Sequence, residues 1–518
     1  MVTCSHLALL ALVGISIAVA ATPLQSILDM AELPPLMEDV WHAEPAPASL
    51  VAGQAIPSVD EKKEIAVAFV RKQLKAYAVP GIALSVVYKN RTVISQGFGT
   101  TKFGHTDAPV TDKSVFQIGS YTKTFIALAI AKLAEESKLA WQDPVKKHLS
   151  SFRLVDKYAE EHTTLEDLAG MNSVFGDHEG DDTWVLGVYD EKSLVDALGS
   201  FKTTRPLRAG IAYSNMNFEV LGQVIEVVTN RTWPEYLRVT FWDPLGMKDT
   251  VGRPADSPQP DLVSFGHLMC DSKVAGPFHL QNSSVVALAP QNNYLSAGSV
   301  LSSAADLSTF SRFLLNKGKG IFASDASVAT LFTGHTIGTV FGSKLPYVGL
   351  TFSPDGNAVS AGLGFDVVGD VAFGNHYFDK GGDTIAHKTR NGFVPDQDLG
   401  VVLLSNGQST GGKVSSRVYL DLIRTYITGL FLDVPVSTLN KGFHTIVSAL
   451  DKLPSQPCDP HFFDGKPWET PGLDIPNRTK TALNGTYHAA DSFYGRGTIF
   501  VEGNDLLLTS LRRQTRMS

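Results

Sequence analysis

The stretch Phe116-Gln-Ile-Gly-Ser120-Tyr-Thr-Lys123-Thr-Phe-Ile-Ala-Leu-Ala-Ile130 is the most informative part of this chain. It places a serine at the start of a predicted helix, about residues 120–137, with a lysine on the same helix face. A serine hydroxyl needs a neighbouring base to become a nucleophile, and a buried Lys123 with a lowered pKa, or a tyrosine held as phenolate, would serve. The helix N-terminus offers N–H groups where an oxyanion would develop.

A simpler interpretation exists for these two residues. Ser120 would only cap the helix, and Lys123 would be a solvated charge. Two observations count against it: this is the only Ser-x-x-Lys in the chain, and the run that follows is apolar nearly all round. Such a helix is buried, and a buried lysine requires a reason.

Tyr213-Ser-Asn215 is a second candidate, because tyrosine can exchange protons and asparagine can bond both a lysine and a substrate amide. The same spacing also occurs at Tyr88-Lys-Asn90, in a predicted hairpin turn that needs no function. The motif is therefore weak by itself.

Lys380-Gly-Gly382-Asp383 is a third candidate, leading into a predicted strand, residues 384–389. Glycines there would let a strand edge approach a substrate closely. A plain Gly-Gly turn is the alternative.

Taken in order, Ser-x-x-Lys, Tyr-x-Asn and Lys-x-Gly resemble the motif set of the serine β-lactamase and penicillin-binding protein family, in its class C-related branch. The resemblance covers about residues 62–430. A tail at about residues 483–508 resembles a small β domain often appended to these hydrolases. Four further landmarks carry the resemblance: Leu139-Ala-Trp-Gln-Asp-Pro-Val, Pro244-Leu-Gly-Met-Lys-Asp-Thr, Ser296-Ala-Gly-Ser-Val-Leu-Ser-Ser-Ala-Ala-Asp-Leu and Val401-Val-Leu-Leu-Ser-Asn.

The resemblance implies a role for each motif residue. Ser120 would be acylated, Lys123 and Tyr213 would transfer protons, and Asn215 would position the substrate. The N–H of Ser120 and one from the strand after Gly382 would form the oxyanion hole.

The third motif departs from the family pattern. Lys380, Gly382 and Asp383 are expected to contact substrate, but Gly381 lacks a hydroxyl and Asp383 stands where a small neutral residue is usual. We therefore expect acylation to survive this change and binding of a substrate carboxylate to be weakened. Acyl transfer through a serine needs no cofactor, and no metal is expected.

Strand patterns near both ends of the chain and helices between them predict an α+β fold: an antiparallel sheet flanked by helices, with an inserted mostly helical region. Helices are expected near residues 60–78, 193–200, 215–229 and 415–430. Strands are expected near residues 81–88, 92–98, 367–373, 399–405, 485–488 and 497–501.

Five segments follow from these patterns. They are a signal peptide (1–20), an extended lead-in (21–60), the β-lactamase-like domain (61–433), a Pro-rich linker (434–480) and a small β appendage (481–518). The appendage stops abruptly, which leaves its completeness open. The first segment lacks Lys and Arg, so an uncleaved anchor is the alternative to a signal peptide.

The net charge of −8 with no long basic run argues against nucleic acid or an anionic membrane surface as partner. A small molecule or peptide substrate is expected, and the oligomeric state stays open. Five Asn-x-Ser/Thr sequons favour secretion. Removing the signal peptide leaves Cys270 and Cys458, which would form one disulfide or remain two buried thiols.

The predicted activity is two-step acyl transfer through a Ser120 acyl-enzyme on an ester or amide, as in an esterase, a D-aminopeptidase or a β-lactamase. The rival is a catalytically silent binding or scaffold protein with the same fold. The acidic run at residues 177–182 is interpreted as a solvated loop rather than a metal site, and no His-Glu-x-x-His zinc motif occurs.

Overall fold

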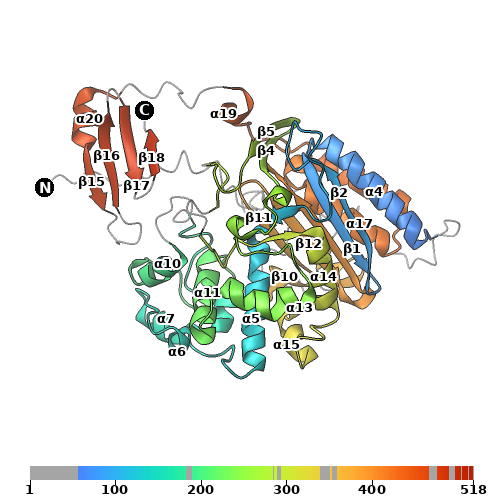
Figure 1. Ribbon diagram of the computed structural model, residues 1–518, viewed down its shortest axis with the longest axis horizontal. Helices are drawn as coiled ribbons and strands as arrows, with labels where there is room; N and C mark the ends of the chain where they lie inside the picture. The colour runs from blue at the N-terminus through green and yellow to red at the C-terminus, as the bar shows by residue number, and fades with distance from the viewer. Residues whose placement is uncertain are drawn as a thin grey trace.

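The computed structural model describes residues 56–181, 190–283, 285–288, 293–338, 350–352, 359–465, 475–488, 496–502, 505–510 and 513–516. Within this part of the chain, nine strands form one antiparallel sheet in the order β2-β1-β13-β12-β11-β10-β9-β7, with β8 paired to β10 (Figure 1). The strands are β1 (Gly81–Tyr88), β2 (Arg91–Gly99), β7 (Thr336–Gly338), β8 (Leu350–Phe352), β9 (Val359–Ala361), β10 (Val367–Ala372), β11 (Asn375–Asp383), β12 (Lys388–Val394) and β13 (Leu399–Ser405).

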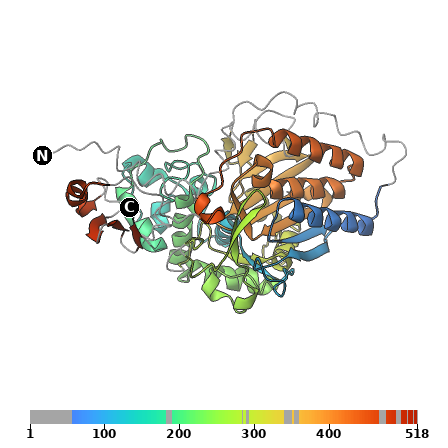
Figure 2. The ribbon, with the colours of Figure 1, turned by 90° about the horizontal axis from the view of Figure 1, so that it is seen from above.

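Both faces of this sheet are covered, which the alternation along β13 makes clear. Val401 and Leu403 pack into one apolar cluster with α4 (Val59–Ala76), α17 (Tyr419–Phe431) and α18 (Val436–Leu450). Figure 2 shows these three helices together on one side of the sheet. Val402 and Leu404 face the other way, into a cluster with α5 (Thr122–Glu135) and α14 (Ala304–Leu315). The buried strands therefore read as continuous apolar runs.

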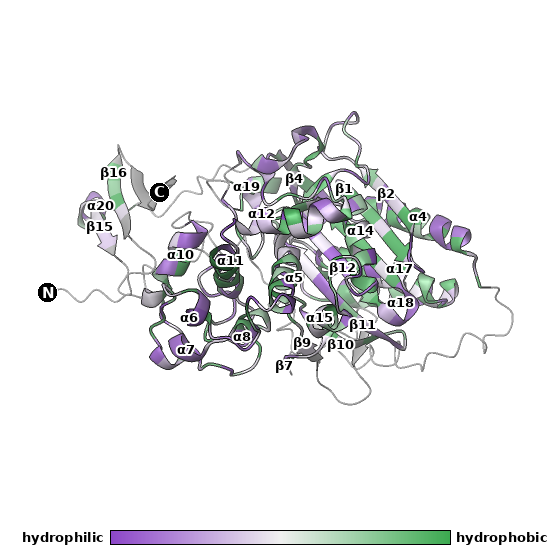
Figure 3. Cartoon of the chain, turned by 60° about the horizontal axis from the view of Figure 1, so that its bottom comes forward, coloured by the Kyte–Doolittle hydropathy of each residue, from purple (hydrophilic) through white to green (hydrophobic). Residues whose placement is uncertain are grey.

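A mostly helical region is inserted between the large-sheet strands β2 and β7, and α5 lies at its centre. The helix is apolar nearly all round, and eleven of its fourteen residues are buried. Figure 3 shows hydrophobic residues on α11 and along the sheet, and polar residues on the outer helices α7 and α10. The other helices are α6 (Val145–His148), α7 (Lys157–His162), α8 (Leu165–Ala169), α10 (Glu191–Ala197), α11 (Asn215–Thr229), α12 (Trp233–Leu237), α13 (Asp243–Leu245), α15 (Asp325–Ala329), α16 (Val414–Arg417), α19 (Pro460–Phe463) and α20 (Asn477–Leu483).

Three smaller sheets complete the described part of the chain. Figure 1 shows the four-stranded sheet near the C-terminus apart from the large one. The first pairs β3 (Val115–Gln117) with β6 (Leu301–Ser303), the second joins β4 (Gly266–Cys270), β5 (Lys273–Phe278) and β14 (Gly407–Gly411), and the third joins β15 (Gly485–His488), β16 (Arg496–Glu502), β17 (Asp505–Ser510) and β18 (Arg513–Arg516).

The predicted α+β fold with a helical insertion is confirmed, and three local predictions are corrected. Ser120 lies in a short 3₁₀ turn, Gly119–Tyr121, ahead of α5 rather than inside it. The predicted strand at residues 384–389 is wrong, because β11 ends at Asp383 and residues 384–387 form the hairpin connection to β12. The middle of the chain also contributes β4 and β5, which the helical interpretation missed.

The predicted linker at residues 434–480 is wrong for its first part. Residues 436–450 form α18, whose Leu439, Ile446 and Leu450 are buried against the α17 side of the sheet. The folded domain therefore extends beyond residue 433. The signal peptide and all but the last five residues of the lead-in lie outside the described residues. Among the described helices, none combines the length and apolar character needed to cross a membrane.

Candidate active site

Ser120 lies in a turn that is wedged between α5 and the end of β11. Gly119 has φ +54°, and a Cβ there would stand 2.8 Å from the carbonyl oxygen of Asp383. A Cβ on Gly382 would stand 1.9 Å from the carbonyl oxygen of Ile118. Only glycine at both positions lets the serine turn and the strand edge come this close.

Lys123 lies directly behind Ser120 and is fully buried. Its Nζ is 3.1 Å from Ser120 Oγ, and it donates to Asn215 Oδ1 at 2.6 Å and to the carbonyl oxygen of Ala297 at 2.7 Å. Burial, reinforced by the positive charge of Lys380, lowers the Lys123 pKa from 10.5 to about 7. This amine therefore loses its proton near neutral pH.

The residues of the Tyr-x-Asn motif come from the start of α11. Asn215 is the first helical residue, and its amide nitrogen donates to Asp181 Oδ2 at 2.7 Å. Tyr213 places its ring 5.1 Å from the Nζ of Lys123 and also of Lys380. Burial, together with the charge of Asp366, raises the Tyr213 pKa well above 10. The phenol therefore keeps its proton, and the phenolate alternative is not supported.

Lys380 reaches the same cluster from the middle of β11. It is fully buried, donates to Tyr213 Oη at 3.2 Å, and forms an ion pair with Asp366 at 2.5 Å. Burial lowers the Lys380 pKa, although the negative charge of Asp366 opposes this. The structure thus brings Ser120, Lys123 and Tyr213 together with Lys380, as the three motifs suggested.

Asp383 contributes to the site through its backbone. Thr384 N donates to the carbonyl oxygen of His387 at 2.9 Å, so these two residues form a hydrogen-bonded pair. Along an antiparallel ladder, hydrogen-bonded pairs alternate with open pairs, whose N–H groups point away from the partner strand. Asp383, paired with Lys388, is therefore in an open pair, and its N–H points away from β12.

The side chain of Asp383 is bound elsewhere than in the Lys380 cluster. Its two oxygens accept from Arg390 Nη1 at 2.6 Å and Nη2 at 3.2 Å. Arg390 also donates to Asp421 on α17 at 2.8 Å. The prediction that Asp383 contacts substrate is therefore wrong for its carboxylate, because Arg390 binds both carboxylate oxygens.

The family assignment agrees with this geometry. The family model for Beta-lactamase matches residues 66–424, more than two thirds of the chain. The chain belongs to the beta-lactamase family. A solved structure with a similar fold, the octameric penicillin-binding protein homologue from Pyrococcus abyssi, superposes with a TM-score of 0.57 and 19% sequence identity, covering 88% of this chain and 89% of that one. At this identity the likeness shows the fold alone.

Two curated relatives match a shorter stretch of the chain. Protein flp of Staphylococcus aureus (strain NCTC 8325 / PS 47) is 27% identical over 244 residues, 46% of each chain. Unguisins hydrolase ungD' of Aspergillus campestris is 25% identical over 283 residues, 52% of this chain and 50% of its own. The chain thus spans about half the length of the curated relatives it matches.

Other sequence candidates lie apart from the serine turn or have a different environment. Of Tyr88-Lys-Asn90, Tyr88 ends β1 and Lys89 and Asn90 form the expected turn to β2. One Gly-x-Ser-x-Gly sequence occurs in the chain, at residues 407–411, and it forms strand β14 rather than a nucleophile elbow. Its Ser409 Oγ donates to the carbonyl oxygen of Ser416 at 2.9 Å, so this serine does not stand at a strand-to-helix turn.

The acidic run at residues 177–182 borders the site rather than forming a plain solvated loop. Asp177 accepts from Tyr213 N at 2.8 Å, and His178 Nδ1 bonds Asp181 Oδ2 at 2.8 Å. Burial lowers the His178 pKa, but the hydrogen bond to Asp181 and the charges of Asp181 and Asp177 together outweigh burial, so the net direction is upward. Asp182 lies outside the described residues.

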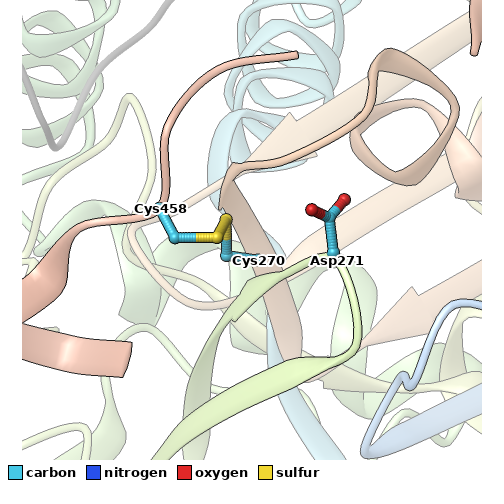
Figure 4. A group of neighbouring side chains, drawn as sticks. All are labelled: Cys270, Asp271 and Cys458. Atoms are coloured by element: carbon cyan, nitrogen blue, oxygen red, sulfur yellow. A yellow bond between two sulfur atoms is a disulfide. The ribbon is translucent and has the colours of Figure 1, made fainter. Parts of the chain in front are cut away.

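Cys270 and Cys458 form a disulfide with Cα atoms 5.6 Å apart, which settles the alternative left open by the sequence. Asp271 lies beside them, and the three side chains are close enough to suggest a metal site. Figure 4 shows the sulfur–sulfur bond, which removes both thiolates as ligands.

Sequence reasoning missed two parts of the site. Asp366 has no motif of its own, and only its place two residues after Gly364 and one before a strand marks it. Glu219 and Glu191 form a buried pair behind Lys123, joined by Ser296, and Glu219 accepts from Ala297 N at 3.2 Å. Burial raises the pKa of both carboxyls, that of Glu219 to about 7. The available signal was Glu219, an acidic residue within the apolar pattern of α11.

Proposed function

We propose that this chain is a serine hydrolase that forms an acyl-enzyme on Ser120 with ester or amide substrates. The observation that carries the proposal is Lys123 Nζ, fully buried and 3.1 Å from Ser120 Oγ, with a pKa lowered to about 7. A lysine in that state is a general base matched to neutral pH.

The hydrogen bonds of Lys123 orient this base. A neutral amine has two protons and one lone pair. Asn215 Oδ1 and the Ala297 carbonyl oxygen accept the two protons, so the lone pair is left for the hydroxyl proton of Ser120. Ser120 Oγ then attacks the carbonyl carbon, and Lys123 becomes an ammonium.

The oxyanion and the leaving group need separate partners. The N–H groups of Ser120 and Asp383 border the serine turn, and both would donate to the oxyanion. Tyr213, which keeps its phenolic proton, would donate it to the leaving oxygen or nitrogen, and Lys123 would return a proton to Tyr213. Water would then cleave the acyl-enzyme with Lys123 again as base.

The decisive experiment is covalent labelling of the purified protein with a fluorescent fluorophosphonate and a fluorescent penicillin. We expect stoichiometric labelling that the Ser120→Ala variant loses. A native protein that reacts with neither probe would favour the silent scaffold. Labelling that survives in Ser120→Ala would remove Ser120 as nucleophile.

We further propose that the protein is secreted. The asparagines of all five sequons are exposed, and the disulfide suits an oxidising compartment. Expression in a eukaryotic host should yield medium-borne protein whose mass falls after treatment with peptide N-glycosidase. Retention in the cytosol without glycans would contradict this. The five asparagines are Asn90, Asn230, Asn282, Asn477 and Asn484.

A further inference from the structure

We propose that Asp366 determines specificity by neutralising Lys380, so that the site accepts uncharged acyl donors and discriminates against substrates with a carboxylate near the scissile bond. This inference rests on the proposed acyl-enzyme chemistry of Ser120. It is carried by the Lys380–Asp366 ion pair and by the way the chain holds Asp366 in place.

Lys380 lies on β11 three residues before Asp383, whose backbone is against the Ser120 turn. A carboxylate-bearing substrate that lies along this strand would need the positive charge of Lys380. Asp366 already takes that charge at 2.5 Å, and Tyr213 Oη accepts a second proton at 3.2 Å. The Lys380–Asp366 pair carries no net charge, so it attracts a substrate anion far less than a free ammonium would.

The position of Asp366 is fixed by its neighbours. Gly364 has φ +76°, and a Cβ there would stand 2.8 Å from the Lys123 carbonyl oxygen, so this turn lies directly on α5. Thr124 Oγ1 donates to the Gly364 carbonyl oxygen at 3.1 Å.

Phe365 lies between Gly364 and Asp366 and anchors the turn on the side opposite α5. Its ring packs edge-on against Phe332 at 5.0 Å and against Phe378 at 5.3 Å, and it is 2% exposed. Phe378 lies two residues before Lys380 on β11. The ion pair is thus built from two anchored segments rather than formed by a loose surface side chain.

The rest of the site adds negative charge. Asp181 Oδ2 accepts from the Asn215 amide nitrogen at 2.7 Å, and after burial and the charge of Asp366 the negative field of Asp181 is a further cause that raises the Tyr213 pKa. A substrate carboxylate would enter this field. The first glycine after Lys380 also supplies no hydroxyl that could donate to it. Charge and hydrogen bonding therefore both favour a neutral acyl donor.

The test compares two aryl esters that have the same acyl group and differ in the charge of the aryl group: 3-carboxyphenyl phenylacetate and its 3-methoxycarbonyl counterpart. We expect the native enzyme to prefer the neutral ester by about tenfold or more in kcat/KM. Asp366→Asn should reduce this preference to about twofold or reverse it, mainly through a lower KM for the carboxylate ester. Asp366→Glu, which keeps the charge, should retain the preference.

Asp396→Asn is the matched control, because Asp396 pairs with His376 at 2.8 Å near the other end of β11 and is exposed. It should leave the preference unchanged. Fluorophosphonate labelling of Ser120 verifies that each variant is folded. It also separates the two proposals, because a native enzyme that is not labelled would contradict the acyl-enzyme proposal rather than the specificity proposal. With labelling intact, three results overturn the specificity proposal: no preference in the native enzyme, no turnover of either ester, or an unchanged preference in Asp366→Asn.

Discussion

Asn215 Oδ1 accepts a 2.6 Å hydrogen bond from Lys123 Nζ, so an amide fixes the direction of the lysine that lies behind Ser120. If neutral Lys123 is the base, acylation rises as the pH passes through its pKa of about 7 and levels off above it. The measurement is the rate of fluorophosphonate labelling from pH 5 to 9.

Two variants sharpen this prediction. Asn215→Asp adds a negative charge beside the ammonium, which stabilises it and moves the midpoint to higher pH. Lys123→Arg keeps a positive charge that does not dissociate, and labelling should fall by about 100-fold or more. A flat profile in the native protein, or a midpoint unmoved in Asn215→Asp, would show that another group is the base.

A second prediction concerns the two glycines of the third motif. Gly382→Ala would force a Cβ to within 1.9 Å of the Ile118 carbonyl oxygen and push β11 away from the serine turn. A Cβ on Gly381 would stand 3.2 Å from Arg390 Nη1, a longer contact that involves a side chain rather than backbone, so Gly381→Ala is the milder, matched control.

We expect Gly382→Ala to slow labelling at least tenfold, because the Ser120 and Asp383 N–H groups separate. Gly381→Ala should stay within about threefold of the native rate, since only a side-chain end must shift. Thermal denaturation distinguishes a displaced strand from an unfolded protein. Equal effects of the two substitutions would contradict this account.

The sequence was sufficient for the parts of the site that carry motifs. Ser120 and Lys123 stand at a fixed spacing on one helix, so local geometry alone predicts their contact. Apolar periodicity likewise predicted α5, α11 and four of the nine described strands of the large sheet, namely β1, β2, β10 and β13. Lys380 was found because two glycines follow it.

Long-range partners were beyond this reasoning. Asp366 reaches Lys380 because the contacts of Phe365 in the core fix the turn that carries Asp366. No sequence pattern near either residue predicts this ion pair. Arg390 can bind the Asp383 carboxylate only because the register of β11 and β12 places Arg390 opposite Gly381, two residues before Asp383. The helix α18 follows Pro435 in a Pro-rich context, which concealed its amphipathic pattern. Tertiary contacts decided all three.

The Cys270–Cys458 disulfide supports a third prediction, since it ties the segment after α18 to β4 across 188 residues. The neighbouring backbone pairs as well: Gly412 N donates to Gln456 O at 2.8 Å, and Gln456 N to Gly412 O at 3.0 Å. Replacing both cysteines by serine should cost about 2–5 kcal/mol of the free energy of unfolding.

The measurement is denaturant unfolding of the native protein and of the double variant, each with and without reductant. Reductant should destabilise the native protein and leave the double variant unchanged. Two free thiols in the purified native protein, by mass after alkylation, would contradict the assignment.

The last prediction is acid destabilisation through two buried histidines. His387 Nδ1 accepts from Gln117 N at 2.8 Å, and His267 Nε2 accepts from Phe103 N at 3.0 Å, so neither ring has room for a second proton at these atoms. Burial lowers the His387 pKa to about 3 and the His267 pKa to about 4. Folding therefore holds both rings neutral.

The sign follows from proton binding in each state. Below pH 6.5 the unfolded chain protonates these histidines and the folded chain does not, so the free energy of unfolding falls as the pH drops from about 6.5 toward 4. Each histidine should remove about 2 kcal/mol by pH 5. Urea unfolding at pH 7, 6 and 5 measures the slope. His387→Gln keeps one acceptor and one donor but does not titrate, so it should flatten that slope, whereas the same change at exposed His376 should not. An equal slope in native protein and His387→Gln would place the acid sensitivity elsewhere.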